Sequence, residues 1–107
     1  MHTLLKVTMA DTAAANASIK EGSFEKIVKD VSKTISPEST FFYAENGFRT
    51  ALFIFDMKDT TQIPSIAEPF FTGLNARVEF FPAMNVKELT SGLEAWNKHT
   101  SSSQSLS

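Results

Sequence analysis

The chain of 107 residues is long enough for one domain, and it contains ten Phe but only one Trp, one Tyr and no Cys. Its 10 basic and 12 acidic residues give a formal net charge of -2 without a block of either sign, which argues against a nucleic-acid or membrane-surface partner. The missing Cys excludes disulfides, thiolate nucleophiles and Cys-ligated metals.

The N-terminal third is predicted to form a strand followed by a broken helix. Residues 3–9 alternate apolar and polar side chains, which is typical of a strand with two unlike faces. An Ala-rich stretch from Asp11 favours a helix that Asp11 or Thr12 can cap. Gly22 and Ser23 interrupt it, and apolar residues at helical spacing then continue to Ile35.

The middle of the chain predicts a hairpin. Residues 39–45 and 48–57 flank Asn46-Gly47, the strongest short-range indication of a two-residue turn between strands. This turn sets the register, with Glu45 opposite Phe48 and Tyr43 opposite Thr50.

The last third predicts a helix, a strand and another helix. Thr60 or Thr61 is expected to cap a helix over residues 60–75, and Pro69 is expected to kink it. A strand over residues 76–81 ends at Pro82, and Asn85 is expected to cap a helix with an apolar stripe of Leu89, Leu93 and Trp96. Residues 100–107, mostly Ser and Thr, are predicted to form a disordered tail behind a domain of residues 1–99.

This order of elements predicts an α+β, ferredoxin-like βαββαβ fold with an additional C-terminal helix. Right-handed crossovers predict a four-stranded antiparallel sheet of order 4-1-3-2. Adjacent Phe pairs at 41–42 and 80–81 then require apolar cover on both faces of the sheet. Because one layer of helices covers only one face, we expect a second copy on the other, where four apolar residues point toward the partner: Phe41, Leu52, Ile54 and Phe81.

A few sequence segments also resemble a known family. They are Glu45-Asn46-Gly47-Phe48-Arg49 at the hairpin, and Ala67-Glu68-Pro69-Phe70-Phe71 followed by Arg77-Val78-Glu79. In these segments and in its order of elements, the chain resembles the dimeric α+β-barrel superfamily, in particular its small bacterial GYD-type members. The resemblance covers residues 3–95 and implies a homodimer whose two sheets face each other in a barrel. Relatives include monooxygenases, isomerases, haem-handling proteins and ligand-binding modules, so the fold alone does not select a function.

The polar residues on the predicted partner-facing side form one candidate site: Lys6, Tyr43, Glu45, Thr50, Arg77 and Glu79. Carboxylates beside cations and a phenol suit acid–base chemistry or anion binding. A cross-strand network that sets the dimer register is the favoured interpretation, because such residues also pair for purely structural reasons.

No metal or cofactor site is predicted. His2 and His99 lie near the two ends without a second ligand nearby, and Asp59 is expected to serve as a helix cap rather than to join Asp56 in a metal-binding turn. No apolar run approaches the length of a membrane span, and the chain is expected to be cytoplasmic. The sequence therefore predicts a homodimeric α+β-barrel protein that binds a small apolar or aromatic acid between sheet and helices. The main alternative is a cofactor-independent monooxygenase or isomerase, and a third is a subunit that regulates a larger partner through its helical surface.

Overall fold

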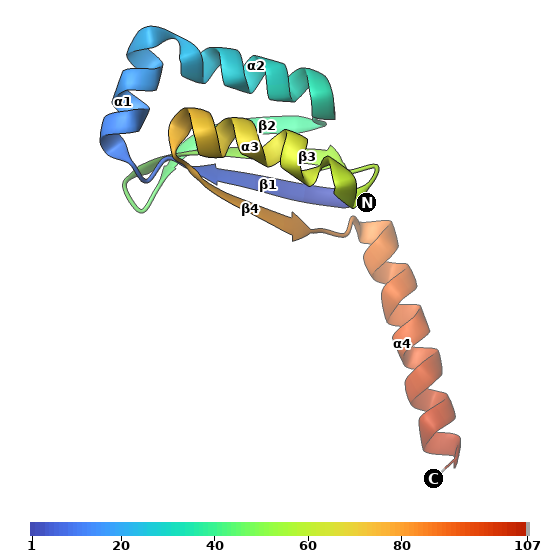
Figure 1. The fold of residues 1–107 in the computed structure, drawn as a ribbon. Coiled ribbons are helices and arrows are strands. Elements are labelled where there is room, and N and C mark those ends of the chain that lie inside the picture. The colour runs from blue at the N-terminus through green and yellow to red at the C-terminus, as the bar shows by residue number, and fades with distance from the viewer. Residues whose placement is uncertain (107) are drawn as a thin grey trace.

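The computed structural model describes the backbone of residues 1–106 and the side chains of residues 1–100. A four-stranded sheet lies beside three helices, and a fourth helix projects away from this body (Figure 1). The elements in chain order are β1 (His2–Thr8), α1 (Thr12–Glu21), α2 (Ser23–Ile35), β2 (Ser39–Glu45), β3 (Phe48–Asp56), the single 3₁₀ turn η1 (Thr60–Gln62), α3 (Ile63–Leu74), β4 (Arg77–Pro82) and α4 (Val86–Leu106).

The predicted α+β, ferredoxin-like fold is confirmed. The strands lie in the order β2-β3-β1-β4, which is 4-1-3-2 counted from the other edge, and all neighbours are antiparallel. The two-residue turn has positive φ at both Asn46 (54°) and Gly47 (80°), the combination that the right-handed twist of a hairpin requires. Glu45 therefore pairs with Phe48 and Tyr43 with Thr50, as the sequence predicts.

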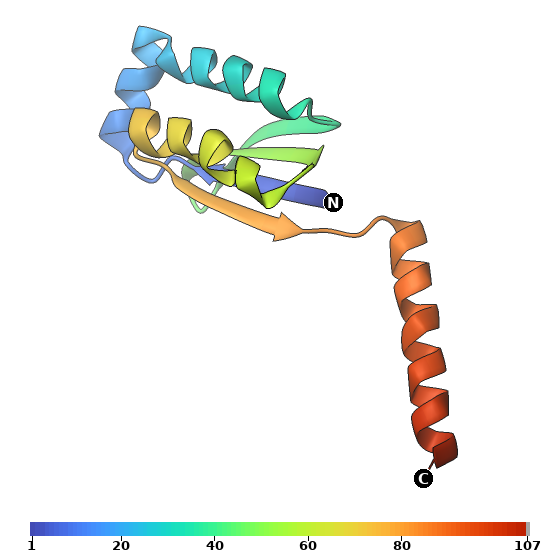
Figure 2. The same cartoon turned by 45° about the vertical axis from the view of Figure 1, so that its right-hand side comes forward.

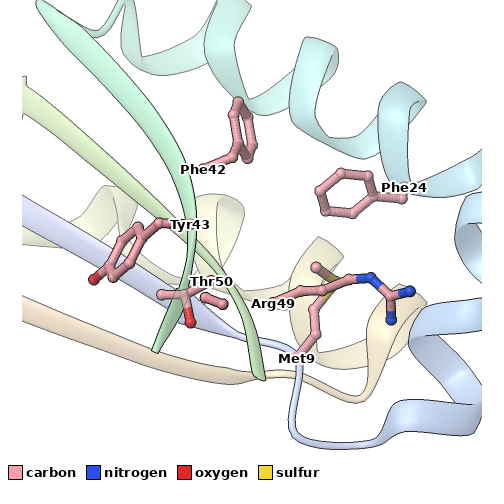
Figure 3. Close-up of a pocket in the computed structure, with 7 residues that line it drawn as sticks. Met9, Phe24, Phe42, Tyr43, Arg49 and Thr50 are labelled. Carbon is pink, nitrogen blue, oxygen red and sulfur yellow. The ribbon is translucent and has the colours of Figure 1, made fainter. Parts of the chain in front are cut away.

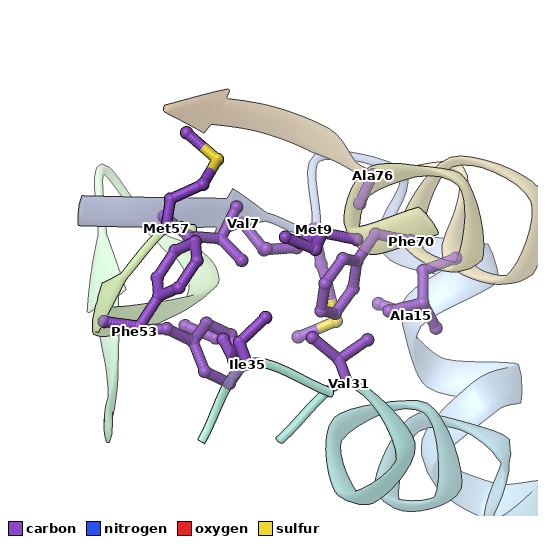
Figure 4. Close-up of a cluster of buried hydrophobic side chains, with 14 residues drawn as sticks. Val7, Met9, Ala15, Val31, Ile35, Phe53, Met57, Phe70 and Ala76 are labelled. Atoms are coloured by element: carbon purple, nitrogen blue, oxygen red, sulfur yellow. The ribbon is translucent and has the colours of Figure 1, made fainter. Parts of the chain in front are cut away.

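One face of the sheet carries the hydrophobic core. Leu5, Phe53 and Phe55 of β1 and β3 are fully buried in one cluster with Ile66 and Phe70 of α3. Figure 4 shows Phe53 and Phe70 among these buried side chains. The rings of Phe53 and Phe70 lie with their centroids 6.0 Å apart. Complete burial of side chains this large supplies the main driving force for folding, at about 1.5–3 kcal/mol each.

The helix break predicted at Gly22 is present. Asp11 caps α1, its carboxylate accepting a hydrogen bond from the backbone N–H of Ala14 at 3.0 Å. Gly22 ends α1 with φ of 83°, a left-handed conformation that glycine adopts without steric cost. The chain turns there, and α2 packs beside α3, with Gly73 of α3 against Ile27 of α2.

The ends of four elements differ slightly from the predictions. The strands β1, β3 and β4 begin and end within one residue of the expected positions. Of the capping residues that the sequence offers, Asp59 accepts the capping hydrogen bond, from the backbone N–H of Thr61 at 2.8 Å, and Thr60 and Thr61 lie inside the turn. The first turn after this cap is 3₁₀, so α3 begins only at Ile63. Pro69 lies within α3.

Helix α4 leaves the body that the sheet and α1 to α3 form. Figures 1 and 2 show it projecting from the end of β4, on the side away from α2. Asn85 and Glu88 cap it reciprocally: each side chain accepts a hydrogen bond from the other residue's backbone N–H. The helix continues to Leu106, through the segment predicted as a disordered tail.

Within residues 1–106, the helices contain no stretch that is both long enough and apolar enough to cross a bilayer.

Candidate functional site

Four of the six predicted polar residues meet on the open face of the sheet, the face without helices. Lys6 on the central strand β1 contacts Glu45 at the end of β2, with its Nζ 2.8 Å from Oε2. The hydroxyl of Tyr43 donates to the other carboxylate oxygen of Glu45 at 2.9 Å. Glu79, opposite Lys6 on β4, lies 4.0 Å from the same ammonium group. Through Lys6, the cluster therefore links the edge strand β2 to β4, the strand at the other edge of the sheet.

These contacts shift the pKa values of three groups. The hydrogen bond from Lys6, followed by that from Tyr43, lowers the pKa of Glu45 below its usual range. The same hydrogen bond to Glu45 raises the pKa of Lys6, and the Tyr43 hydroxyl, held by the carboxylate, also has a raised pKa. Glu45 is thus a firmly ionised carboxylate at neutral pH with both oxygens engaged, which is typical of a structural ion pair.

The other two predicted residues lie outside this network. Thr50 is almost completely buried at 2 % exposure, and its hydroxyl donates to the carbonyl of Phe48 at 3.1 Å. Arg77 is exposed on β4, and no ion pair involving it occurs among the side chains of residues 1–100. The alternation of strand residues predicts the correct sheet face for both residues. Which groups each side chain contacts depends on its neighbours in the folded chain.

The four residues predicted to face a partner all lie on this open face. The ring of Phe81 has the Lys6 ammonium 6.0 Å from its centroid, which fits a cation–π contact. Phe41 and Phe81 are exposed, whereas Leu52 and Ile54 are half-buried on the inner strand β3. Aromatic and aliphatic side chains thus surround a small group of charges.

A pocket of about 330 Å³ lies on the other side of the sheet, between the start of α2 and the edge formed by β2 and β3. Figure 3 shows the rings of Phe24 and Phe42 on one side and the Arg49 side chain beside Met9. The backbone N–H of Met9 donates to the carbonyl of Arg49 at 2.9 Å, which holds these two residues together. The remaining wall is formed by Tyr43, Ala44 and Thr50.

The rings of Phe24 and Phe42 form the apolar side of this pocket, and the buried ring of Phe53 lies against Phe42. The centroids of Phe24 and Phe42 are 6.2 Å apart, and those of Phe42 and Phe53 are 6.5 Å apart, both in edge-to-face geometry. Arg49 contributes the one charged group among the residues that line the pocket, and no ion pair among residues 1–100 involves it. An apolar pocket with a single cation suits a ligand that has an apolar body and a negative end.

Sequence reasoning did not single out Arg49, although the hairpin register contains the necessary information. The pairing of Ala44 with Arg49 puts this arginine on the face that otherwise carries Ala51, Phe53 and Phe55. A cation on an apolar face, next to the edge strand, indicates either a side chain that reaches solvent or a binding group. Phe24, by contrast, reaches the pocket only through the packing of α2.

The remaining titratable candidates have structural partners. His2 lies between two carboxylates, with Nε2 3.1 Å from Oε1 of Glu38 and Nδ1 3.4 Å from Oε1 of Glu88. Asp56 pairs with the N-terminal ammonium and, at 3.4 Å, with Lys58. In the part of the chain that the structure describes, no three His, Asp or Glu side chains are grouped in a way that would hold a metal ion.

Comparisons with protein-family models, with curated proteins and with solved structures find no match to this chain.

Proposed function

We propose that this chain is a ligand-binding protein that takes a small apolar or aromatic carboxylic acid in the pocket beside Phe24, Phe42 and Arg49. We further propose that it acts as a homodimeric α+β barrel in which two open sheet faces pack together. The position of Arg49 at an otherwise apolar pocket is the observation that carries the ligand proposal.

The dimensions and chemistry of the pocket suit such a ligand. Its volume of about 330 Å³ is at the lower end of the range for small-molecule sites. An aromatic ring or short alkyl chain beside Phe24 and Phe42 would cover apolar surface that a single chain leaves exposed. The Arg49 guanidinium can donate two parallel hydrogen bonds to a carboxylate, which adds both affinity and orientation.

Exposed aromatic residues support the dimer. Phe41 is 56 % exposed and Phe81 40 % exposed on the same sheet face, with Leu52 and Ile54 between them. Contiguous apolar surface of this kind usually marks a contact site. Arg77 and Glu79 lie on the same face, two residues apart on the edge strand β4. Across a two-fold axis, each can meet the opposite charge of the second copy.

The enzymatic alternative has weaker support. A general base works best when its pKa is near the working pH and its lone pairs can reach the substrate. Glu45 has a lowered pKa and accepts hydrogen bonds from both Lys6 and Tyr43. These contacts favour a structural role for the polar cluster over proton transfer by a monooxygenase or isomerase.

Ligand binding is tested with phenylacetate and its neutral counterpart phenylacetamide. We expect phenylacetate to bind about tenfold more tightly, because one charge-assisted hydrogen-bond pair at an accessible site contributes roughly 1.4 kcal/mol. Titration calorimetry measures the two affinities, and NMR chemical-shift changes at Phe24 and Phe42 locate the site. Replacement of Arg49 by Gln should abolish the preference for the acid.

Arg77→Gln provides the matched control, because it removes the same charge on the opposite face of the sheet. It should leave the preference for phenylacetate unchanged. Equal affinities for the acid and the amide, or equal effects of the two arginine variants, would show that Arg49 is not the binding group.

A further inference from the structure

Helix α4 presents an apolar stripe that no side chain of residues 1–100 covers. Val86, Leu89, Leu93 and Trp96 are all exposed, with Val86 at 81 % and Trp96 at 61 %. The helix stands away from the sheet and from α1 to α3 in both views (Figures 1 and 2). Its start is capped by Asn85 and Glu88, and Glu88 contacts His2 of β1, with Oε1 3.4 Å from Nδ1. The stripe is therefore held out toward solvent.

The spacing of the stripe is symmetric. The four residues are separated by steps of three, four and three, so the order of steps is the same in both directions along the helix. Steps of three and four are those of a coiled-coil seam, in which each side chain inserts between residues of a facing helix. In an antiparallel pair, Val86 would lie level with Trp96 of a second copy, and Leu89 with Leu93.

The charges of α4 are placed as such a pair requires. At about 100° per residue, all four charged side chains of residues 86–100 lie on the half of the helix opposite the stripe; they are Lys87, Glu88, Glu94 and Lys98. The positions beside the stripe, Thr90, Gly92 and Asn97, are uncharged. Two copies can thus approach without like-charge repulsion, and antiparallel helix dipoles attract each other.

Gly92 leaves room beside the stripe. It has no side chain, and an added Cβ would meet no described atom outside its own stretch of helix within 4 Å. The space beside this glycine is therefore open to a neighbouring helix.

We infer that α4 is a self-association arm, which pairs antiparallel with α4 of a second copy through Val86, Leu89, Leu93 and Trp96. The stripe spans ten residue steps, or about 15 Å at a rise of 1.5 Å per residue. A contact of this length buries less than the roughly 1,200 Å² of a standard stable interface, so the pairing is concentration-dependent. It is distinct from the proposed contact between open sheet faces.

Cysteine cross-linking tests the pairing directly, because the natural chain has no Cys. Full-length Leu89→Cys protein is mixed with full-length Leu93→Cys protein, which carries a tag of different size, and oxidised at high protein concentration. The antiparallel arrangement predicts disulfides almost only between the two different variants. Cross-links within each variant would instead indicate a parallel pair and would overturn the proposal.

Fluorescence of Trp96, the only tryptophan, provides an independent measurement. Its emission should shift to longer wavelength on dilution, as the helices separate and the indole enters water. Leu93→Asp should remove this concentration dependence, whereas Ser91→Asp, on the opposite side of the same helix, should retain it.

Two other placements of α4 would give different cross-linking and fluorescence results. Folding of α4 onto its own sheet would bury Trp96 at every concentration and give no cross-links between copies. Docking of α4 on the sheet of a second copy would bury Trp96 on association, again without cross-links between positions 89 and 93. Either result would refute the α4 pair, and neither bears on the binding of phenylacetate beside Arg49.

Discussion

The two faces of the sheet consist of alternate residues from the same four strands, yet their surroundings are opposite. Phe53 faces the helices and is completely buried, whereas Phe41, on the adjacent strand and the other face, is 56 % exposed. Apolar content is high on both faces, so hydrophobicity does not distinguish them. The difference lies in what the chain itself supplies: α1 to α3 cover one face, and α4, which could have covered the other, projects away.

The helices do not cover all of their own sheet face, and Phe42 lies where the cover is missing. It points to the helix side, as predicted, and its ring meets Phe24 and Phe53. It is nevertheless 55 % exposed, because β2 is an edge strand and α2 covers only part of it. The pocket lies at this gap, so the candidate ligand site is a consequence of partial cover at the sheet edge.

The largest effect is expected from removal of a side chain on the covered face. Phe53→Ala should lower the free energy of unfolding by about 3–5 kcal/mol, since it leaves a cavity between β3 and α3. Urea unfolding monitored by circular dichroism measures the change. Phe41→Ala is the matched control on the open face and should cost about 0.5 kcal/mol or less at concentrations where the chain is monomeric. Similar losses for both would mean that the open face is also packed within one chain.

A charged residue introduced on the open face should weaken dimer formation, whereas the change at Phe53 lowers the stability of a single chain. Phe81→Asp is expected to raise the dissociation constant of the dimer by about tenfold or more, because an unpaired carboxylate in an interface loses its hydration. Sedimentation equilibrium measures the mean mass over a range of concentrations. Phe71→Asp, at a similarly exposed aromatic residue on α3, should leave that mass unchanged. If Phe71 and Phe81 variants behave alike, the open sheet face is not the contact surface.

The smallest effect concerns pH and the ion pair on the open face. The pKa of Glu45 is lowered by folding, so its contribution to stability is present above the unfolded pKa of about 4.3 and is lost as pH falls through the lower folded pKa. Lys6 has a raised pKa, so its contribution is present at neutral pH and is lost only as pH rises through a value above 10.5.

Glu45→Gln separates this contribution from that of the other acidic residues. The difference in unfolding free energy between the natural chain and the variant should be largest near neutral pH and should shrink toward acid pH. Urea unfolding at a series of pH values measures it. A difference that stays constant down to the lowest pH would show that the ionised form of Glu45 does not stabilise the fold.

Much of the architecture follows from local patterns in the sequence. The period of two in the strands assigned each residue to its face, and Asn46-Gly47 fixed the register of the hairpin because both residues accept positive φ. Once this register is known, the neighbours across β2 and β3 follow, including Tyr43 opposite Thr50, whereas the contact of Lys6 with Glu45 also depends on how β1 pairs with β3. The Phe70-Phe71 pair also follows, with Phe70 buried and Phe71 exposed on α3.

Other features were decided only by tertiary packing. The meeting of Phe24 with Phe42 and Arg49 depends on where α2 crosses the sheet, and the contact of His2 with Glu38 and Glu88 joins three distant segments. Periodicity also predicted the stripe of Leu89, Leu93 and Trp96, but not that it is exposed. A local pattern specifies which side of a helix or strand is apolar. What covers that side depends on how distant segments pack. That packing leaves the open sheet face and the stripe of α4 uncovered by the side chains of residues 1–100.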